Sequence, residues 1–150
     1  MLRAVASVIA GYATMAVTVM VTFMIACVAL GVDRTLEPGS YEPSSLWVIL
    51  SFALGLLGAV AGGWVCAAIA RSATPPKVLI GLVVLLGLAM AAWTLLSTGE
   101  GAVPPARTAD VGTLEAMQYA KTPGWVAVLN PIVGAVGIWI GAARLSKRRA

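Results

Sequence analysis

Four long apolar runs, separated by polar segments, organise the chain. Each run is at least 19 residues long and contains no Asp, Glu, Lys or Arg. A helix that rises 1.5 Å per residue needs about 20 apolar residues to cross a hydrocarbon core roughly 30 Å thick. We therefore predict an all-α membrane protein, a single domain over residues 1–150, with four transmembrane helices at about 5–32, 46–70, 78–96 and 125–143.

Small residues recur at helical spacing in the second and fourth runs. On a helix with 100° per residue, Gly55, Gly58, Gly62 and Cys66 of the second run fall within an arc of about 80°, so one flank has almost no side chains. Helices in lipid associate by close contact across such flanks. The glycines predicted to form these helix-packing faces are Gly55, Gly58, Gly62, Gly134, Gly137 and Gly141.

The second and fourth runs also share sequence. Trp47-Val-Ile-Leu resembles Trp125-Val-Ala-Val, and residues 58–64 resemble residues 134–139 when gaps are allowed. A weaker match joins residues 8–11 to residues 78–81. Two explanations stay open: a duplicated helical hairpin with a pseudo-two-fold axis along the membrane normal, or chance similarity between apolar segments.

Charged residues are sorted between the two sides of the predicted membrane. The N-terminus, the segment between the second and third runs, and the tail hold seven cations and no acid: Arg3, Arg71, Lys77, Arg144, Lys147, Arg148 and Arg149. The other two loops hold all six acids and three cations. Because Lys and Arg are enriched in cytoplasmic loops, we predict a multi-pass protein of the inner (plasma) membrane with both termini cytoplasmic. The basic tail then favours anionic lipid over nucleic acid.

Asn130, followed by Pro131, is the most informative polar residue in a span. It shares a helix face with the glycines of the fourth run, so we predict that it is buried against a neighbouring helix and hydrogen-bonded there. Pro131 cannot donate to the carbonyl of Ala127. The pair predicts a structural kink, with part of a substrate or ion site as the alternative.

A stripe of small and hydroxyl residues follows one face of the first run. It consists of Ser7, Gly11, Thr14, Thr18 and Thr22. Thr14 and Thr18 could line a polar pathway together with Asn130, but hydroxyls in transmembrane helices commonly bond their own helix or pack against a neighbour. We favour packing. A second stripe, Met20, Met24 and Cys27, offers soft ligands for Cu(I). A simpler explanation is that these side chains only fill space in the core or face lipid.

The loops predict two further features. Residues 33–44 read as a short loop with a Pro38-Gly39 turn and Ser44 as a helix cap, and residues 110–121 read as a short amphipathic helix in the third loop. Cys27 and Cys66 are expected at different depths, so no disulfide is predicted.

The pattern is typical of small four-span bacterial inner-membrane proteins and predicts no catalytic constellation. The chain contains no histidine, which removes the commonest metal and haem ligand, and we predict no catalytic residue, cofactor or metal. The favoured function is a structural or accessory subunit that contacts the lipid bilayer and another membrane protein or a second copy of itself. The alternative is a small oligomeric transporter or channel that uses Asn130, Pro131, Thr14 and Thr18.

Overall fold

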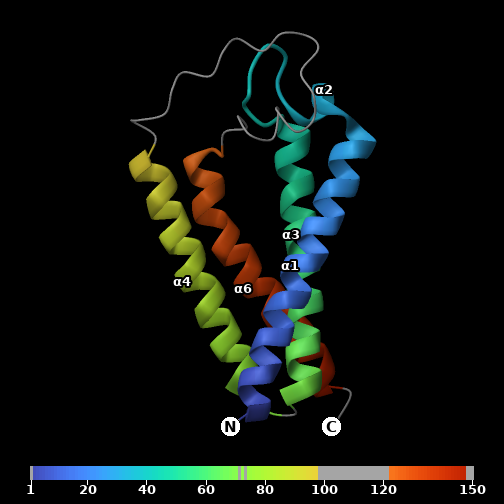
Figure 1. Ribbon diagram of the computed structural model, residues 1–150, viewed down its shortest axis with the longest axis vertical. Coiled ribbons are helices and arrows are strands. Elements are labelled where there is room, and N and C mark those ends of the chain that lie inside the picture. Colours follow the sequence, from blue (N-terminus) through green and yellow to red (C-terminus); the bar gives the residue numbers. More distant parts are fainter. Residues whose placement is uncertain (1, 71, 73, 98–121, 148–150) are drawn as a thin grey trace.

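The computed structural model describes residues 2–70, 72, 74–97 and 122–147. Within these ranges the helices are α1 (Leu2–Leu30), α2 (Val32–Thr35), α3 (Ser45–Ala70), α4 (Thr74–Ser97) and α6 (Gly124–Lys147). All except α2 are long and apolar enough to cross a membrane, and they run alternately up and down (Figure 1). The prediction of an all-α chain with four such helices is confirmed, while the amphipathic helix predicted at residues 110–121 lies outside the described residues.

Glycine and proline explain where two helix ends differ from the prediction. The α1 helix ends at Leu30 because Gly31 has a φ of 72°, a conformation that glycine adopts without a steric penalty. The α4 helix begins at Thr74, four residues earlier than predicted. Pro75 and Pro76 then occupy its first turn, where the missing N–H groups have no helical acceptor to lose.

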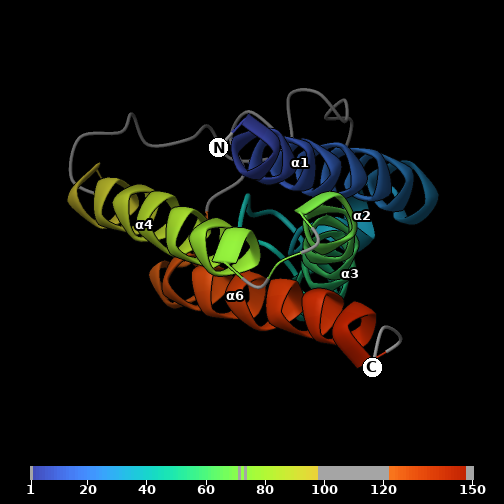
Figure 2. The same ribbon diagram turned by 90° about the horizontal axis from the view of Figure 1, so that it is seen from below.

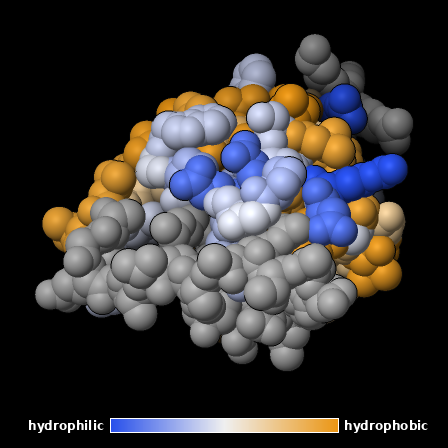
Figure 3. All heavy atoms as spheres, turned by 90° about the horizontal axis from the view of Figure 1, so that it is seen from above, coloured by the Kyte–Doolittle hydropathy of each residue, from blue (hydrophilic) through white to orange (hydrophobic). Residues whose placement is uncertain are grey.

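The segment between α1 and α3 is more ordered than a plain loop. After α2, Leu36 pairs with Pro43 in an isolated antiparallel bridge, and the predicted Pro-Gly turn places Gly39 at a φ of 72°. Leu36 and Tyr41 are buried together beneath this turn. Seen from above, the described residues form a hydrophilic centre flanked by apolar helix sides (Figure 3). This small folded cap fixes the connection between α1 and α3.

Ser44 caps the start of α3 as predicted. The backbone N–H of Trp47 donates to the Ser44 hydroxyl oxygen at 3.1 Å, which satisfies one of the free donors in the first turn. The same hydroxyl donates to the carbonyl oxygen of Arg34 at 2.6 Å. The Ser44 side chain therefore joins the first turn of α3 to the folded segment of residues 32–44 that precedes it.

Helix α3 holds the bundle together. It packs extensively against both α1 and α6, whereas α4 packs chiefly against α6. Figures 1 and 2 show two hairpin pairs, α1 with α3 and α4 with α6, that approach each other at the lower end and spread apart toward the upper end. The compact core lies where they meet, and its buried members are Ala59, Cys66, Leu79 and Ile138.

Candidate functional site

The contact between α1 and α3 is made across glycines. A Cβ on Gly62 would lie 2.6 Å from the carbonyl oxygen of Gly11 and 2.8 Å from the Cβ of Met15. A Cβ on Gly58 would lie 2.5 Å from a Val19 methyl group. These distances are too short for any side chain, so glycine at these positions sets how closely the two helices approach.

The contact between α3 and α6 follows the same principle on another flank of α3. A Cβ on Gly137 would lie 2.5 Å from the Cβ of Ala59, and one on Gly141 would meet the Val60 carbonyl and the Trp64 backbone nitrogen. Gly63 faces the backbone of Ile138 in the same way. The sequence reasoning missed Gly63, although its place beside Gly62, 100° around the helix, is the signal for a second packing face.

Helix α6 meets α4 through a different pair of small positions. A Cβ on Gly134 would lie 3.0 Å from a Val83 methyl group, and one on Gly87 would lie 2.5 Å from the Pro131 ring. Pro131 is buried, so its ring fills space between the two helices. Gly87 was not singled out from the sequence because the other glycine of its run, Gly81, is six residues away and falls on a different face of the helix.

Gly55 is an exception among the glycines predicted to pack. It lies on α3 one turn above Gly58, yet no atom of another helix comes within 4 Å of its Cβ position. The prediction of close packing is wrong at this position. The helix flank continues as predicted, but the neighbouring helices have diverged at this height, as Figure 1 shows for the two pairs.

Asn130 is likewise exposed rather than buried. It shares a face of α6 with Gly134 and Gly137, but these lie one and two turns lower, where α4 and α3 cover them. No side-chain hydrogen bond joins Asn130 to another residue that the structure describes. The prediction that Asn130 is buried and bonded to a neighbouring helix is therefore wrong, because that face is packed only in its lower half.

Side-chain size explains why α3 and α6 are further apart in the upper half of the bundle. Glycines and alanine bring α3 and α6 together lower down, but near the upper ends the two helices meet through the rings of Phe52 and Trp125, whose centroids are 6.1 Å apart. Two aromatic rings hold the helix axes further apart than a glycine contact does. The missing helix contact at Gly55 and the exposure of Asn130 follow from this change along the helices.

The hydroxyl stripe of α1 serves mostly its own helix. The hydroxyls of Thr14 and Thr22 donate to the carbonyls of Ala10 and Thr18, at 2.8 and 2.7 Å. Ser7 is buried and donates to the carbonyl of Ala4. These bonds match the local bonding expected of such residues in lipid, and they support packing over a polar pathway.

The three residues of the soft-ligand stripe, Met20, Met24 and Cys27, differ in their exposure to solvent. Cys27 is buried and reduced, whereas Met20 and Met24 are 62% and 56% exposed. Cys66, the other cysteine, is also free and buried. Among the described residues, no group of three His, Cys, Asp or Glu side chains is placed to hold a metal ion.

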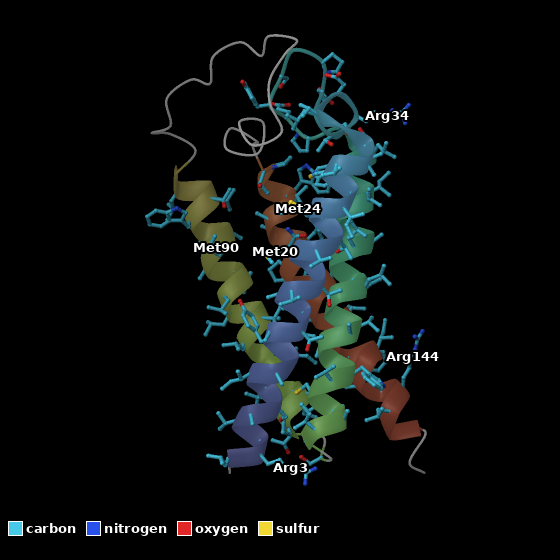
Figure 4. The ribbon with its side chains drawn as sticks, turned by 45° about the vertical axis from the view of Figure 1, so that its right-hand side comes forward. Arg3, Met20, Met24, Arg34, Met90 and Arg144 are labelled. Carbon is cyan, nitrogen blue, oxygen red and sulfur yellow. The ribbon has the colours of Figure 1, made fainter. Side chains whose placement is uncertain are left out.

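Charged side chains lie at the two ends of the bundle. Arg3 and Arg144 lie toward the end that carries both termini, while Arg34 lies at the opposite end (Figure 4). The Arg3 Nε donates to the carbonyl oxygen of Ile69 at 2.8 Å, which satisfies a carbonyl in the last turn of α3 and places a cation at the negative end of its dipole.

The fold defines a helical, multi-pass membrane protein whose close contacts are built on glycine. The comparisons with known proteins do not extend this class: no protein-family model, curated protein or solved structure matches the chain.

Proposed function

We propose that the protein is a structural or accessory subunit of the membrane. The observation that supports this most directly is α3, which packs backbone against backbone with both α1 and α6. Such packing builds a rigid scaffold, because a side chain added at any of these glycines would force a whole helix to move. The hydroxyls of α1 bond within their own helix, which is the arrangement expected of a scaffold rather than of a conducting path.

The orientation that we propose places both termini in the cytoplasm and the α2 cap outside, in the inner membrane of a bacterium. The charge distribution supports it. Arg3, Lys77 and Arg144 belong to the end with the termini, and the cap carries Asp33 and Glu37. A cytoplasmic excess of Lys and Arg is the expected bias.

We also propose that the chain contains a duplicated helical hairpin. It would relate α1 and α3 to α4 and α6 by a pseudo-two-fold axis along the membrane normal. One pair of contacts supports it: Gly58 meets α1, its partner in the first hairpin, and the aligned Gly134 meets α4, its partner in the second. The match is incomplete, since Gly62 faces α1 but the aligned Gly137 faces α3.

The second candidate function is a small oligomeric transporter or channel. Asn130 favours it, because an exposed amide inside an apolar helix is a polar group at a depth where lipid offers no hydrogen bond. In this case, Asn130, Pro131, Thr14 and Thr18 would contribute polar groups to a pathway completed by further subunits.

Cross-linking in native membranes tests the accessory function. The full chain, tagged at one terminus, is cross-linked in cells, extracted in mild detergent and analysed by mass spectrometry. We expect another membrane protein at fixed stoichiometry, and we expect the Gly62→Leu variant, with its α1–α3 contact disrupted, to recover far less of it. A Gly81→Leu variant is the matched control because no atom lies within 4 Å of the Gly81 Cβ position.

The transporter is tested separately with the purified chain in planar bilayers in KCl. A steady conductance that Asn130→Leu removes would replace the accessory function with the channel. Absence of both a stoichiometric protein partner and a conductance would reject both candidates.

A further inference from the structure

Arg3 carries a cation whose position is fixed across the contact between α1 and α3. Its Nε donates to the carbonyl oxygen of Ile69, in the last turn of α3, at 2.8 Å, although the Arg3 side chain is exposed. A guanidinium has five N–H donors, and this bond uses one of them. The planar fork of such a group matches the oxygens of a phosphate. The fold therefore holds a phosphate-binding group in place at this end of the bundle.

The sequence supplies only positive side chains to this end. The N-terminus, residues 71–77 and the tail hold seven cations and no acid, and the helix ends that adjoin them lie at the lower end of the bundle (Figure 1). In the described part, the side chains of Lys77 and Arg144 are exposed like that of Arg3. A surface with charge of one sign concentrates ions of the other sign, so this end attracts anions.

The depth of Arg3 is that of phospholipid headgroups. Helix α1 has 29 residues and is about 44 Å long at 1.5 Å per residue, which is close to the thickness of a bilayer with its headgroup regions. The first turn of α1 therefore lies at one surface of the membrane. Leu2 and Val5, in the same turn as Arg3, are 89% and 59% exposed. One helical turn thus presents a cation and two apolar side chains.

We propose that Arg3 belongs to a binding site for an anionic phospholipid, at the lower end of the contact between α1 and α3. The guanidinium binds the phosphate of the lipid, and the acyl chains cover Leu2 and Val5. The Nε bond to Ile69 holds the guanidinium at the level of the headgroups, so little side-chain freedom remains to be lost on binding.

The combination of groups in this turn selects a phospholipid as the occupant. A free phosphate has no apolar part to cover Leu2 and Val5, and an acidic protein loop would place charged groups against them, at a cost in desolvation. The surrounding cations select an anionic lipid over a zwitterionic one, because a choline group would add a further positive charge to this end.

This inference goes beyond the accessory function and depends neither on it nor on the proposed orientation. An experimental bilayer of one composition presents the same lipid to both ends of the bundle. The purified chain and defined lipids are therefore sufficient to test the site, without any protein partner.

The first experiment titrates the purified full chain in detergent with phosphatidylglycerol or phosphatidylcholine and measures binding by native mass spectrometry. We expect phosphatidylglycerol to bind more tightly. Arg3→Gln should weaken its binding about five-fold, the factor that corresponds to one cation near a membrane surface, and should leave phosphatidylcholine unchanged. Arg34→Gln is the matched control, because it removes an exposed arginine at the opposite end (Figure 4) and should not alter either affinity.

The second experiment uses the native sequence, so it does not depend on the folding of a variant. The chain in nanodiscs is irradiated with phosphatidylglycerol or phosphatidylcholine analogues that carry a photoreactive headgroup, and adducts are mapped by mass spectrometry. We expect the phosphatidylglycerol analogue to give the higher yield near Arg3 and Ile69. Residues 31–44, at the opposite end, should show equal yields for the two analogues. Added inorganic phosphate should not reduce the adducts.

Four results would overturn the inference: equal affinity for the two lipids, equal weakening by Arg3→Gln and Arg34→Gln, preferential adducts at residues 31–44, or loss of the adducts in inorganic phosphate. The last result would show that the site takes free phosphate. None of them alters the outcome of cross-linking to a membrane protein, so failure of this site and failure of the accessory function are distinguishable.

Discussion

Gly62 determines the distance between α1 and α3. The nearest atoms to its Cβ position are the Gly11 carbonyl oxygen and the Met15 Cβ, and both belong to the rigid backbone region of α1 rather than to the flexible end of a side chain. Any substitution must therefore displace a helix. In a membrane, where lipid is as apolar as the helix surface, close contacts of this kind supply much of the association energy.

We expect Gly62→Leu to lower the free energy of unfolding in detergent by roughly 1–3 kcal/mol or more, the range for overpacking a filled site. Gly81→Leu should have little effect, since its Cβ position has no atom within 4 Å. Thermal unfolding of both variants, followed by circular dichroism, is the measurement. Equal losses would show that the glycine flank of α3 does not form the contact.

At the scale of elements, the helix ends are fixed by a few polar groups outside the membrane. Ser44 connects the start of α3 to the cap through two hydrogen bonds, from the Trp47 N–H and to the Arg34 carbonyl. The bond to Trp47 follows from helix geometry, whereas the bond to Arg34 depends on the fold of residues 32–44.

We expect Ser44→Ala to cost about 1 kcal/mol of stability, as is usual for the loss of an N-cap. Ser45→Ala is the matched control, because Ser45 is exposed at the first helical position and alanine is the better helix former there. Unfolding in a titration with a denaturing detergent compares the two. A Ser45→Ala variant as unstable as Ser44→Ala would contradict the capping role.

Helix α6 is packed through different kinds of contact along its length. Its lower half meets α3 through Gly137 and Gly141, while its upper half meets α3 through Trp125 and Phe52. Pro131 lies between these regions and packs against Gly87 of α4. Pro131 therefore has a packing role, while Asn130, its neighbour in sequence, is exposed.

At the scale of the whole molecule, the distribution of charge predicts orientation. In a background with Cys27 and Cys66 replaced by alanine, Glu37→Cys in the cap should react with a membrane-impermeant thiol reagent in intact cells. Ser72→Cys, between α3 and α4, should react only after the membrane is opened, because we place that turn in the cytoplasm. Both positions are exposed to solvent in the fold. Labelling of Ser72→Cys alone in intact cells would invert the orientation.

The chain by itself determined the local features of this protein. The four apolar runs predicted four spanning helices because the cost of an unpaired backbone in lipid leaves helix as the only conformation for such a run. Ser44 and the Pro38-Gly39 turn were predictable because their chemistry acts over three or four residues. The positions of Gly58, Gly62, Gly137 and Gly141 identified packing faces from spacing alone.

Only the tertiary structure decided which part of each face is covered. Periodicity places Gly55 beside Gly58 and Asn130 beside Gly134, but it does not report the angle between two helices. That angle results from side chains on different helices, here the small residues at the lower crossing and the Phe52–Trp125 contact above it. Gly55 and Asn130 lie above the point where α3 and α6 cross. For that reason no other helix contacts Gly55, and Asn130 is exposed.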